Sequence, residues 1–292
     1  MTKPRTLDRR TPAKPPRPLK SVNPLKNNSD KQWKTALTCI EPNRILVRGY
    51  PLDEMMGRLS FGESIYLLLV GEVPGPAIGR LVEALLVSFI DHGVTPPPTL
   101  AARNVTTTGA ATRNAVAAGV LGFGKFYGGD IQACRHLLDE GLVLTEGGKS
   151  YRDAAIELID RVHEKHDLFP GFGHRYHQRD PRAARLFQMA LELDLEGPHI
   201  QMIRALEMAL HEKGIGDEMT MPINVDGAIA AVCADIGLAP EVSDALFIIS
   251  RIPGIVAHSL EEQAREQPMR VIEPSKHSYD GPSERRLPDR RK

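Results

Sequence analysis

The segment from Phe169 to His174, Phe-Pro-Gly-Phe-Gly-His, carries the strongest chemical signal in the chain. Gly171 and Gly173 flank an aromatic residue, and glycine permits positive φ angles and a close approach of the backbone to a ligand. A histidine at the end of such a loop can transfer protons near neutral pH. The residues alone leave two interpretations open: a proton-transfer site at His174, or a surface loop with an incidental histidine.

Three further charged residues occupy positions on expected helices where their charge needs an explanation. Arg182 follows Pro181, which suits the first turn of a helix, and it could be an ordinary first-turn residue. Asp226 stands at a helix start, where a carboxylate can be a base or simply an N-cap. Arg251 lies among isoleucines, and a cation on an apolar helix needs a partner.

The composition excludes several classes of function. Hydrophobic residues make up 41% and charged residues 25% of the 292 residues, as in ordinary globular proteins. The formal net charge is zero, so no overall field favours a nucleic acid or a membrane surface. No apolar run reaches the roughly 20 residues that span a bilayer. Cys39, Cys134 and Cys233 lack metal-binding spacing, which favours reduced thiols and a cytoplasmic location.

Hydrophobic periodicity predicts an all-α protein. Ser60 and Glu63 have the spacing of a capping box before an apolar helical face. Further helices are expected over residues 76–90, 130–138, 151–163, 182–193, 198–213 and 242–262. The stretch from Thr99 to Gly124 is rich in small residues and is predicted to form one buried helix; its β-branched residues leave a strand possible, but alternation is absent.

Both ends of the chain differ from this helical region. Residues 1–31 are rich in Pro, Lys and Arg and nearly lack large apolar side chains, so we predict a disordered basic tail. This tail has no apolar segment of a secretory signal. Residues 283–292 are predicted to form a second, solvated tail.

Several motifs together resemble the citrate synthase superfamily. The Gly-Phe-Gly-His loop followed by Asp180-Pro181-Arg182 resembles one signature of that family. Asn224-Val225-Asp226-Gly227 and the stretch from Ser250 to His258 resemble two more. The segments 45–50 and 59–74 are similar to the family's opening, and the motifs occur in family order.

The resemblance implies a two-domain helical fold in which a small domain is inserted in a large one. Residues 130–224 would form the small domain, and residues 32–129 and 225–282 would form the large domain. The cleft between the domains would close on substrate. The resemblance also implies a homodimer or a higher homo-oligomer.

The resemblance also implies a role for each candidate residue. Asp226 would move the α-proton of the acetyl group, and His174 would act on the ketone or hydroxyl oxygen. His92, Arg182 and Arg251 would bind substrate carboxylates. The CoA adenine would be lined by Phe169, Pro170, Gly171, Phe172 and Gly173. The substrates would be a CoA thioester with oxaloacetate, or citryl-CoA, without a bound cofactor or metal.

Two positions depart from the synthase pattern. Tyr127 stands where synthases carry a histidine that bonds the enolate oxygen, and we expect it to contact substrate. Glu273 stands where synthases carry an arginine. These departures, and a chain length without the usual synthase N-terminal extension, resemble citryl-CoA lyases and the citryl-CoA lyase domain of ATP-citrate lyase. Citrate or methylcitrate synthase, and a weakly catalytic acyl-CoA-binding protein, remain alternatives.

Overall fold

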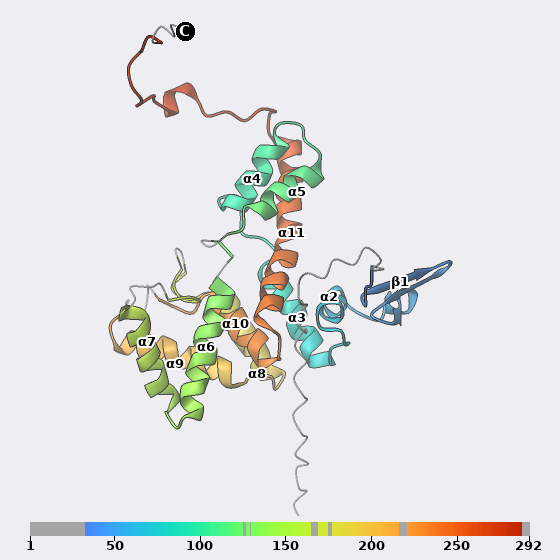
Figure 1. Ribbon diagram of the computed structural model, residues 1–292, viewed down its shortest axis with the longest axis vertical. Helices are drawn as coiled ribbons and strands as arrows, with labels where there is room; N and C mark the ends of the chain where they lie inside the picture. Colours follow the sequence, from blue (N-terminus) through green and yellow to red (C-terminus); the bar gives the residue numbers. More distant parts are fainter. Residues whose placement is uncertain are drawn as a thin grey trace, which may run out of the picture. The chain divides into compact units, whose positions relative to one another are not determined.

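The computed structural model describes residues 33–124, 127–128, 130–164, 169–174, 177–215 and 221–287. The described chain is mostly helical, with one small sheet, which confirms the predicted helical fold class (Figure 1). Contacts divide the chain into two compact units. Unit 1 contains residues 1–90 and 124–251, and unit 2 contains residues 91–123 and 252–292.

These two units have different boundaries from the domains that the family resemblance implies. The division into a small domain of residues 130–224 and a large domain around it therefore stays a prediction. The basic tail of residues 1–31 lies outside the described residues. Within the second predicted tail, residues 283–287 are described, and all of them are exposed.

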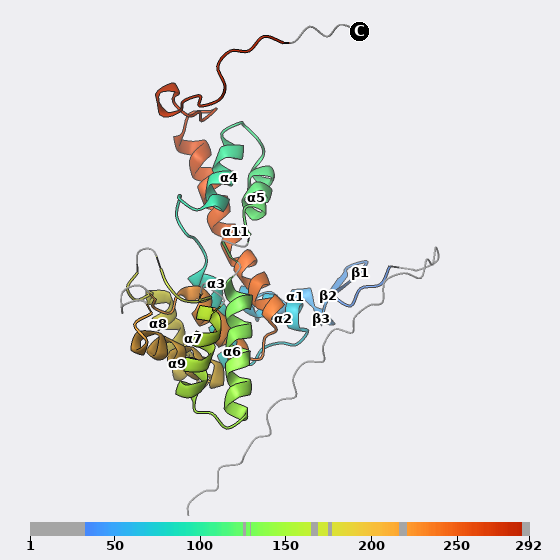
Figure 2. The same ribbon diagram turned by 60° about the vertical axis from the view of Figure 1, so that its left-hand side comes forward.

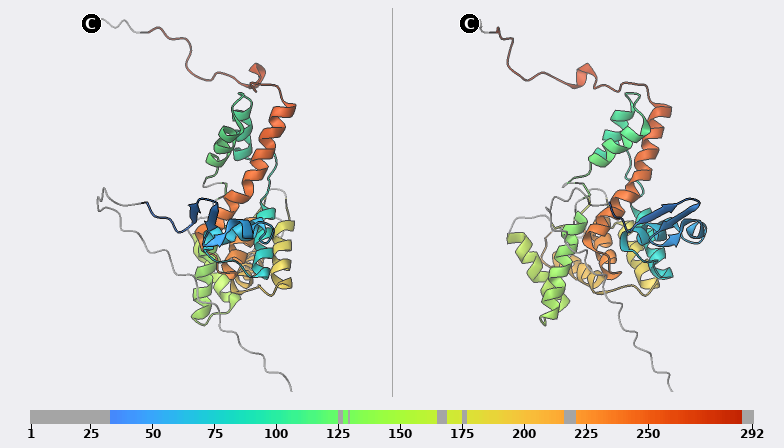
Figure 3. Two further views of the ribbon diagram at one scale, coloured as in Figure 1. Left: turned by 90° about the vertical axis from the view of Figure 1, so that its right-hand side faces the viewer. Right: turned by 45° about the vertical axis from the view of Figure 1, so that its right-hand side comes forward.

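Unit 1 begins with three short antiparallel strands that the periodicity did not predict (Figure 3). The strands are β1 (Thr38–Glu41), β2 (Arg44–Val47) and β3 (Tyr50–Pro51), and they pair in the order β1-β2-β3. Asn43 connects β1 and β2 with a φ of 60°, a conformation that asparagine tolerates better than most residues. The strands have at most four residues and are largely exposed, so no alternating apolar pattern marks them.

The capping box at Ser60 is confirmed. It starts α2 (Phe61–Val70), after α1 (Leu52–Met55) and before α3 (Pro76–Ser88). The Ser60 amide donates to Glu63 Oε2 at 2.7 Å, and the Glu63 amide donates to Ser60 Oγ at 3.2 Å. This reciprocal pair satisfies two amides that the helix cannot use.

The core of unit 1 surrounds α10 (Val225–Asp235). Nine of its residues are buried, four of them alanines, so neighbouring helices can pack on it from several sides. Its neighbours are α6 (Asp130–Glu146), α8 (Pro181–Glu192) and α9 (Pro198–Glu212), while α7 (Tyr151–Glu164) packs on α6 and α9 (Figure 2).

Unit 2 contains a pair of short helices, α4 (Pro97–Thr106) and α5 (Thr112–Leu121), which pack against each other. The prediction of one helix from Thr99 to Gly124 is therefore wrong. The chain turns between α4 and α5, where Gly109 has a φ of 81° that a helix cannot accommodate. The remaining helix, α11 (Pro240–Arg265), begins in unit 1 and continues into unit 2, followed by the 3-10 turn η1 (Pro274–Lys276).

Candidate functional site

Main-chain hydrogen bonds join the histidine loop of unit 1 to the segment before α10. The Gly173 amide donates to Pro222 O at 2.8 Å, and the Asn224 amide donates to Gly171 O at 3.0 Å. The Asn224 side chain adds a bond from Nδ2 to Gly173 O at 3.1 Å. Two segments about fifty residues apart in sequence are thereby held side by side, which brings the loop that ends at His174 next to the helix that carries Asp226.

The close approach of the two segments requires glycine at both sides of the contact. Gly171 has a φ of +83°, and a Cβ atom there would lie 2.5 Å from Cys134 Sγ and 2.8 Å from Gly227 Cα. A Cβ atom on Gly227 would collide with Gly171 O. The glycine spacing noted in the sequence therefore serves backbone packing as well as loop conformation.

Asp180 connects the start of α8 to the start of α10, a role that its sequence motif alone does not indicate. Its buried carboxylate accepts from the Arg182 amide at 2.9 Å, from Arg182 Nη2 at 2.7 Å and from the Val225 amide at 3.1 Å. Burial raises the pKa of Asp180, but the hydrogen bonds and charge of Arg182 bring the pKa below its ordinary value. Its position as N-cap before Pro181 was the available signal in the sequence.

His174 ends the loop half-buried, with its ring stacked on His177 at a centroid distance of 4.3 Å. The His177 amide donates to His174 Nδ1 at 3.0 Å, so the neutral ring carries its proton on Nε2. Burial and the neighbouring His177 lower the pKa of His174, an effect that Asp180 opposes. At neutral pH His174 therefore presents Nε2–H as a hydrogen-bond donor.

Asp226 lies half-buried in the first turn of α10. It is not the N-cap, because Asn224 Oδ1 fills that role and accepts from the Gly227 amide at 3.1 Å. Burial raises the pKa of Asp226 to about 6, and Asp130 adds to the rise, while Arg182 and Arg251 oppose it. Such a carboxyl group can both accept and release a proton near neutral pH.

Arg251 and Tyr127 both lie beside Phe247 in unit 1. The Arg251 guanidinium carbon lies 5.3 Å from the centre of the Phe247 ring and 5.8 Å from that of Phe89. Arg251 is 4% exposed, and cation–π contacts of this kind stabilise a desolvated guanidinium. Tyr127 packs edge-on to Phe247 with ring centres 6.3 Å apart. The Phe247 ring thus packs against two residues, Arg251 and Tyr127, that the sequence predicts to contact substrate.

The other predicted site residues divide between the units. Phe169, Gly171 and Phe172 are buried in unit 1, whereas Pro170 and Gly173 are partly exposed. His92 is exposed and belongs to unit 2, whereas His174, Asp226, Arg182, Arg251 and Tyr127 belong to unit 1. Glu273 is exposed and pairs with Lys276 at 3.2 Å.

A groove of about 970 Å³ adjoins the site in unit 1. It runs between α8 and α9, and Asp180 and Ile223 form part of its wall. Apolar side chains line it together with basic Arg179, Arg204 and His211 and with acidic Asp180 and Glu207. This volume and the mixed apolar and charged lining suit a small-molecule ligand.

The part of the chain that the structure describes contains neither a metal-binding cluster nor a membrane-spanning helix. No group of three or more His, Cys, Asp or Glu side chains there is arranged to hold a metal ion, and the expected absence of a metal stays a prediction. No helix there is both long enough and apolar enough to cross a bilayer.

The described fold is helical, with His174 at the end of a loop and Asp226 in the first turn of a helix. The family described as "Citrate synthase, C-terminal domain" matches residues 74–275, which is more than half of the chain. The chain belongs to the citrate synthase family. The family match, together with the relatives described next, shows that it is an enzyme of that family.

Three relatives of this chain have three different names. A citryl-CoA lyase from Hydrogenobacter thermophilus is 36% identical, with a TM-score of 0.79 over 88% of this chain and 98% of that one. Citrate synthase 2 of Bacillus subtilis is 28% identical over 81% of this chain. An ATP citrate lyase from Methanothrix soehngenii, solved with citrate and coenzyme A, shares the fold at 19% identity and a TM-score of 0.72 over 88% of this chain and 43% of that one.

The curated relatives are longer than the matched region. The alignment spans 60% of the Bacillus citrate synthase 2 and 46% of the citrate synthase from Dictyostelium discoideum. The activity of those complete proteins therefore comes to this chain only as a proposal.

Proposed function

We propose that the protein cleaves citryl-CoA, or a related 3-hydroxy-3-carboxyacyl-CoA, to acetyl-CoA and oxaloacetate. The observation that carries this proposal is the arrangement around Asp226. A half-buried carboxyl group with a pKa of about 6 stands beside a histidine loop and feels the charges of Arg182 and Arg251. The likeness to the Hydrogenobacter citryl-CoA lyase along nearly the whole of that chain favours cleavage over synthesis.

In the cleavage direction the bond between the acetyl carbon and the hydroxyl-bearing carbon breaks. The hydroxyl group loses its proton to His174 and becomes the ketone of oxaloacetate, while Asp226 gives a proton to the acetyl carbon. Neutral His174 holds its own proton on Nε2 because Nδ1 accepts from the His177 amide. We therefore expect the His177 amide to release Nδ1 and the ring proton to move from Nε2 to Nδ1, because only an unprotonated Nε2 can accept the hydroxyl proton.

The same groups serve condensation in the opposite direction. Asp226 as a carboxylate removes a proton from acetyl-CoA, and His174 Nε2–H donates to the ketone oxygen. Arg182, Arg251 and His92 bind the carboxylates of oxaloacetate, and Tyr127 donates to the thioester oxygen. The backbone of residues 169–173 contacts the adenine of CoA, and the groove beside Asp180 receives another part of the ligand.

The test uses the purified full-length protein and two substrate sets. Citryl-CoA should yield acetyl-CoA and oxaloacetate without release of free CoA, as measured by chromatography and by a thiol reagent. Acetyl-CoA with oxaloacetate should release little thiol. Rapid thiol release from that second mixture, with no acetyl-CoA formed from citryl-CoA, would contradict the lyase proposal.

The second candidate function is citrate or methylcitrate synthesis, in which thioester hydrolysis follows condensation. The curated relatives favour it, because the Bacillus subtilis matches are named "Citrate synthase 2" and "Citrate/2-methylcitrate synthase" at 28% and 27% identity. The departures at Tyr127 and Glu273 argue against it. Propionyl-CoA and acetyl-CoA compared in the thiol assay would separate the two synthase activities.

The assembly and location of the enzyme belong to the same proposal. We expect a homodimer in the cytoplasm, as the family resemblance and the cysteine content suggest. Light scattering coupled to size-exclusion chromatography measures the first directly, and a mass equal to one chain would contradict it.

A further inference from the structure

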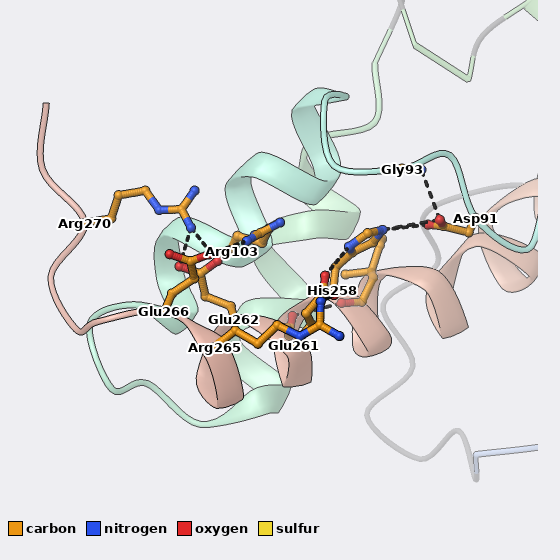
Figure 4. A network of polar contacts seen from close by, with 11 residues as sticks. Asp91, Gly93, Arg103, His258, Glu261, Glu262, Arg265, Glu266 and Arg270 are labelled. Atoms are coloured by element: carbon orange, nitrogen blue, oxygen red, sulfur yellow. Dashed lines mark hydrogen bonds and ion pairs between the residues drawn. The ribbon is translucent and has the colours of Figure 1, made fainter.

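His258 and Asp91 form a pair in unit 2 that the proposed mechanism does not use (Figure 4). His258 Nε2 lies 3.1 Å from Asp91 Oδ1 and 3.3 Å from Asp91 Oδ2. The two residues are 167 positions apart in sequence, so the pair joins α11 to the segment before α4. The side chain of His258 is only 13% exposed, whereas that of Asp91 is 44% exposed.

Asp91 in turn controls the backbone around His92. Asp91 Oδ2 accepts from the Gly93 amide at 3.0 Å, and the His92 amide also bonds the Asp91 carboxylate. Burial raises the pKa of Asp91, but these amide bonds and His258 bring it below its ordinary value. Gly93 has a φ of +75°, which is typical of a tight turn, and the bond from its amide to the Asp91 carboxylate closes the turn around His92.

His258 is itself oriented by a row of charges along α11. His258 Nδ1 lies 3.6 Å from Glu261 Oε2, and Glu261 Oε1 accepts from Arg265 Nη1 at 2.6 Å, as Figure 4 shows. Of the two ring nitrogens, Nε2 lies within hydrogen-bond distance of the Asp91 carboxylate, and Nδ1 makes no hydrogen bond to a described residue. The partly exposed Asp91 carboxylate is thereby held in one rotamer on the side that bonds the His92 and Gly93 amides.

We propose that His258 is a positioning residue that fixes the conformation of His92 through Asp91. The inference rests on the proposed function, in which His92 binds a carboxylate of oxaloacetate. Loss of His258 frees the Asp91 carboxylate to turn toward water, and the His92 backbone loses its fixed geometry. Substrate binding then weakens although His258 touches no substrate.

The test combines His258→Leu with His258→Gln and with His92→Ala. Leucine removes the bond to Asp91, while the glutamine amide can still donate to it from a similar position. His258→Leu should raise the KM for oxaloacetate about tenfold, the size expected for one lost charge-assisted hydrogen bond, with kcat within about twofold. His258→Gln should restore most of the affinity. Exposed His136, on α6 of unit 1, provides the control His136→Leu, which should change neither constant.

A double-variant cycle separates positioning from a purely structural role. In the His92→Ala background, His258→Leu should weaken oxaloacetate binding no further, measured by titration calorimetry as well as by KM. Additive effects, or a His258→Leu protein with unchanged KM, would overturn the inference. If His92→Ala binds oxaloacetate as the unaltered protein does, or if the unaltered protein does not bind it, the proposed role of His92 fails and the inference fails with it.

Discussion

The candidate site of unit 1 is held mainly by main-chain hydrogen bonds, with one buried ion pair between Asp180 and Arg182, whereas unit 2 contains a cluster of ion pairs around Glu262. In unit 1 the loop at Gly171 and the segment at Asn224 meet backbone to backbone. In unit 2, Glu262 is 2% exposed and lies between Arg103 and Arg270, at 2.6 Å from a nitrogen of each (Figure 4).

The difference follows from how much apolar material each unit buries. The site of unit 1 rests on α10 and on large buried residues such as Ile203 and Leu206, which can hold a backbone contact rigidly. One core cluster of unit 2 has three buried members, Ala102, Ala115 and Ile255, and Val105, Val116 and Phe123 are only partly buried against it. A core with few fully buried large side chains contributes less burial, so charged contacts there have more structural weight. Substitutions that enlarge a buried residue should therefore destabilise unit 1 most, and substitutions that remove a buried charge should destabilise unit 2 most.

The largest effect is expected for Asp226→Asn. Asparagine keeps the shape but can neither accept nor release the proton, so kcat should fall by about 10³-fold, within the range for loss of a general acid–base group. Steady-state rates with citryl-CoA, and with acetyl-CoA and oxaloacetate, provide the measurement. An unchanged rate in both directions would contradict the proposed role of Asp226 and favour a weakly catalytic, acyl-CoA-binding protein.

Asp226→Asn, although it lowers kcat, should raise the stability of the folded protein above a pH of about 6. The folded protein raises the pKa of Asp226 to about 6, so it favours the protonated form. This contribution is fully present below the unfolded pKa and is lost as pH rises through about 6. Asp226→Asn should therefore have a higher melting temperature than the unaltered protein at pH 8, and nearly the same one at pH 4.

Next in size is the charge substitution in unit 2. Glu262→Gln leaves Arg103 and Arg270 beside an uncharged group, and the free energy of unfolding should fall by about 3 kcal/mol, as for other broken buried ion pairs. The control is Glu266→Gln, because Glu266 is 49% exposed and lies 3.8 Å from Arg103. That change should cost about 0.5 kcal/mol or less in urea denaturation. Equal losses in the two variants would remove the contrast between the units.

A size substitution tests unit 1. Gly171→Ala places a methyl group against Cys134 Sγ and Gly227 in a backbone with a φ of +83°, and should destabilise the protein by about 2–3 kcal/mol. Gly148→Ala is the matched control, since Gly148 has a φ of +99° but no atom near its would-be Cβ. Its cost should be about 1 kcal/mol. A Gly171→Ala protein as stable as Gly148→Ala would show that the close approach is not required.

The helices with full apolar periodicity could be predicted from sequence, and some structure could not. The expected helix of residues 151–163 corresponds to Tyr151–Glu164, because flanking glycines and a regular apolar face mark it. The exposed strands from Thr38 to Pro51 have no such face. The turn at Gly109 was missed because small residues fit either one long helix or two short ones.

The candidate site was predictable only as a set of motifs. Asp180 was visible as part of a signature, but its bond to the Val225 amide, 45 positions away, depends on tertiary structure. The link between His258 and Asp91 is still longer and has no local pattern. Burial, which raises the pKa of Asp226, likewise follows from packing that the sequence does not display.

The smallest effect is expected for Asp130→Asn, because Asp130 changes the pKa of Asp226 and has no proposed contact with substrate. Asp130 raises the pKa of Asp226 through its charge, so its neutralisation should move that pKa downward. Condensation requires the Asp226 carboxylate and rises with pH through this pKa, while cleavage requires the protonated acid and falls. Both inflections in kcat/KM should shift to lower pH in Asp130→Asn, and the effect on the maximal rate should be less than about tenfold.

Asp153→Asn is the control, because Asp153 is exposed at the start of α7 and should leave the profile unchanged. A shift in only one of the two directions would mean that Asp226 is not the common acid and base. In that case the two units would still differ in how they are packed, but unit 1 would no longer be distinguished as the unit that carries the catalytic acid and base. If the inflections in kcat/KM for condensation and for cleavage both shift to lower pH, Asp226 in unit 1 is the group that exchanges the proton in both reactions.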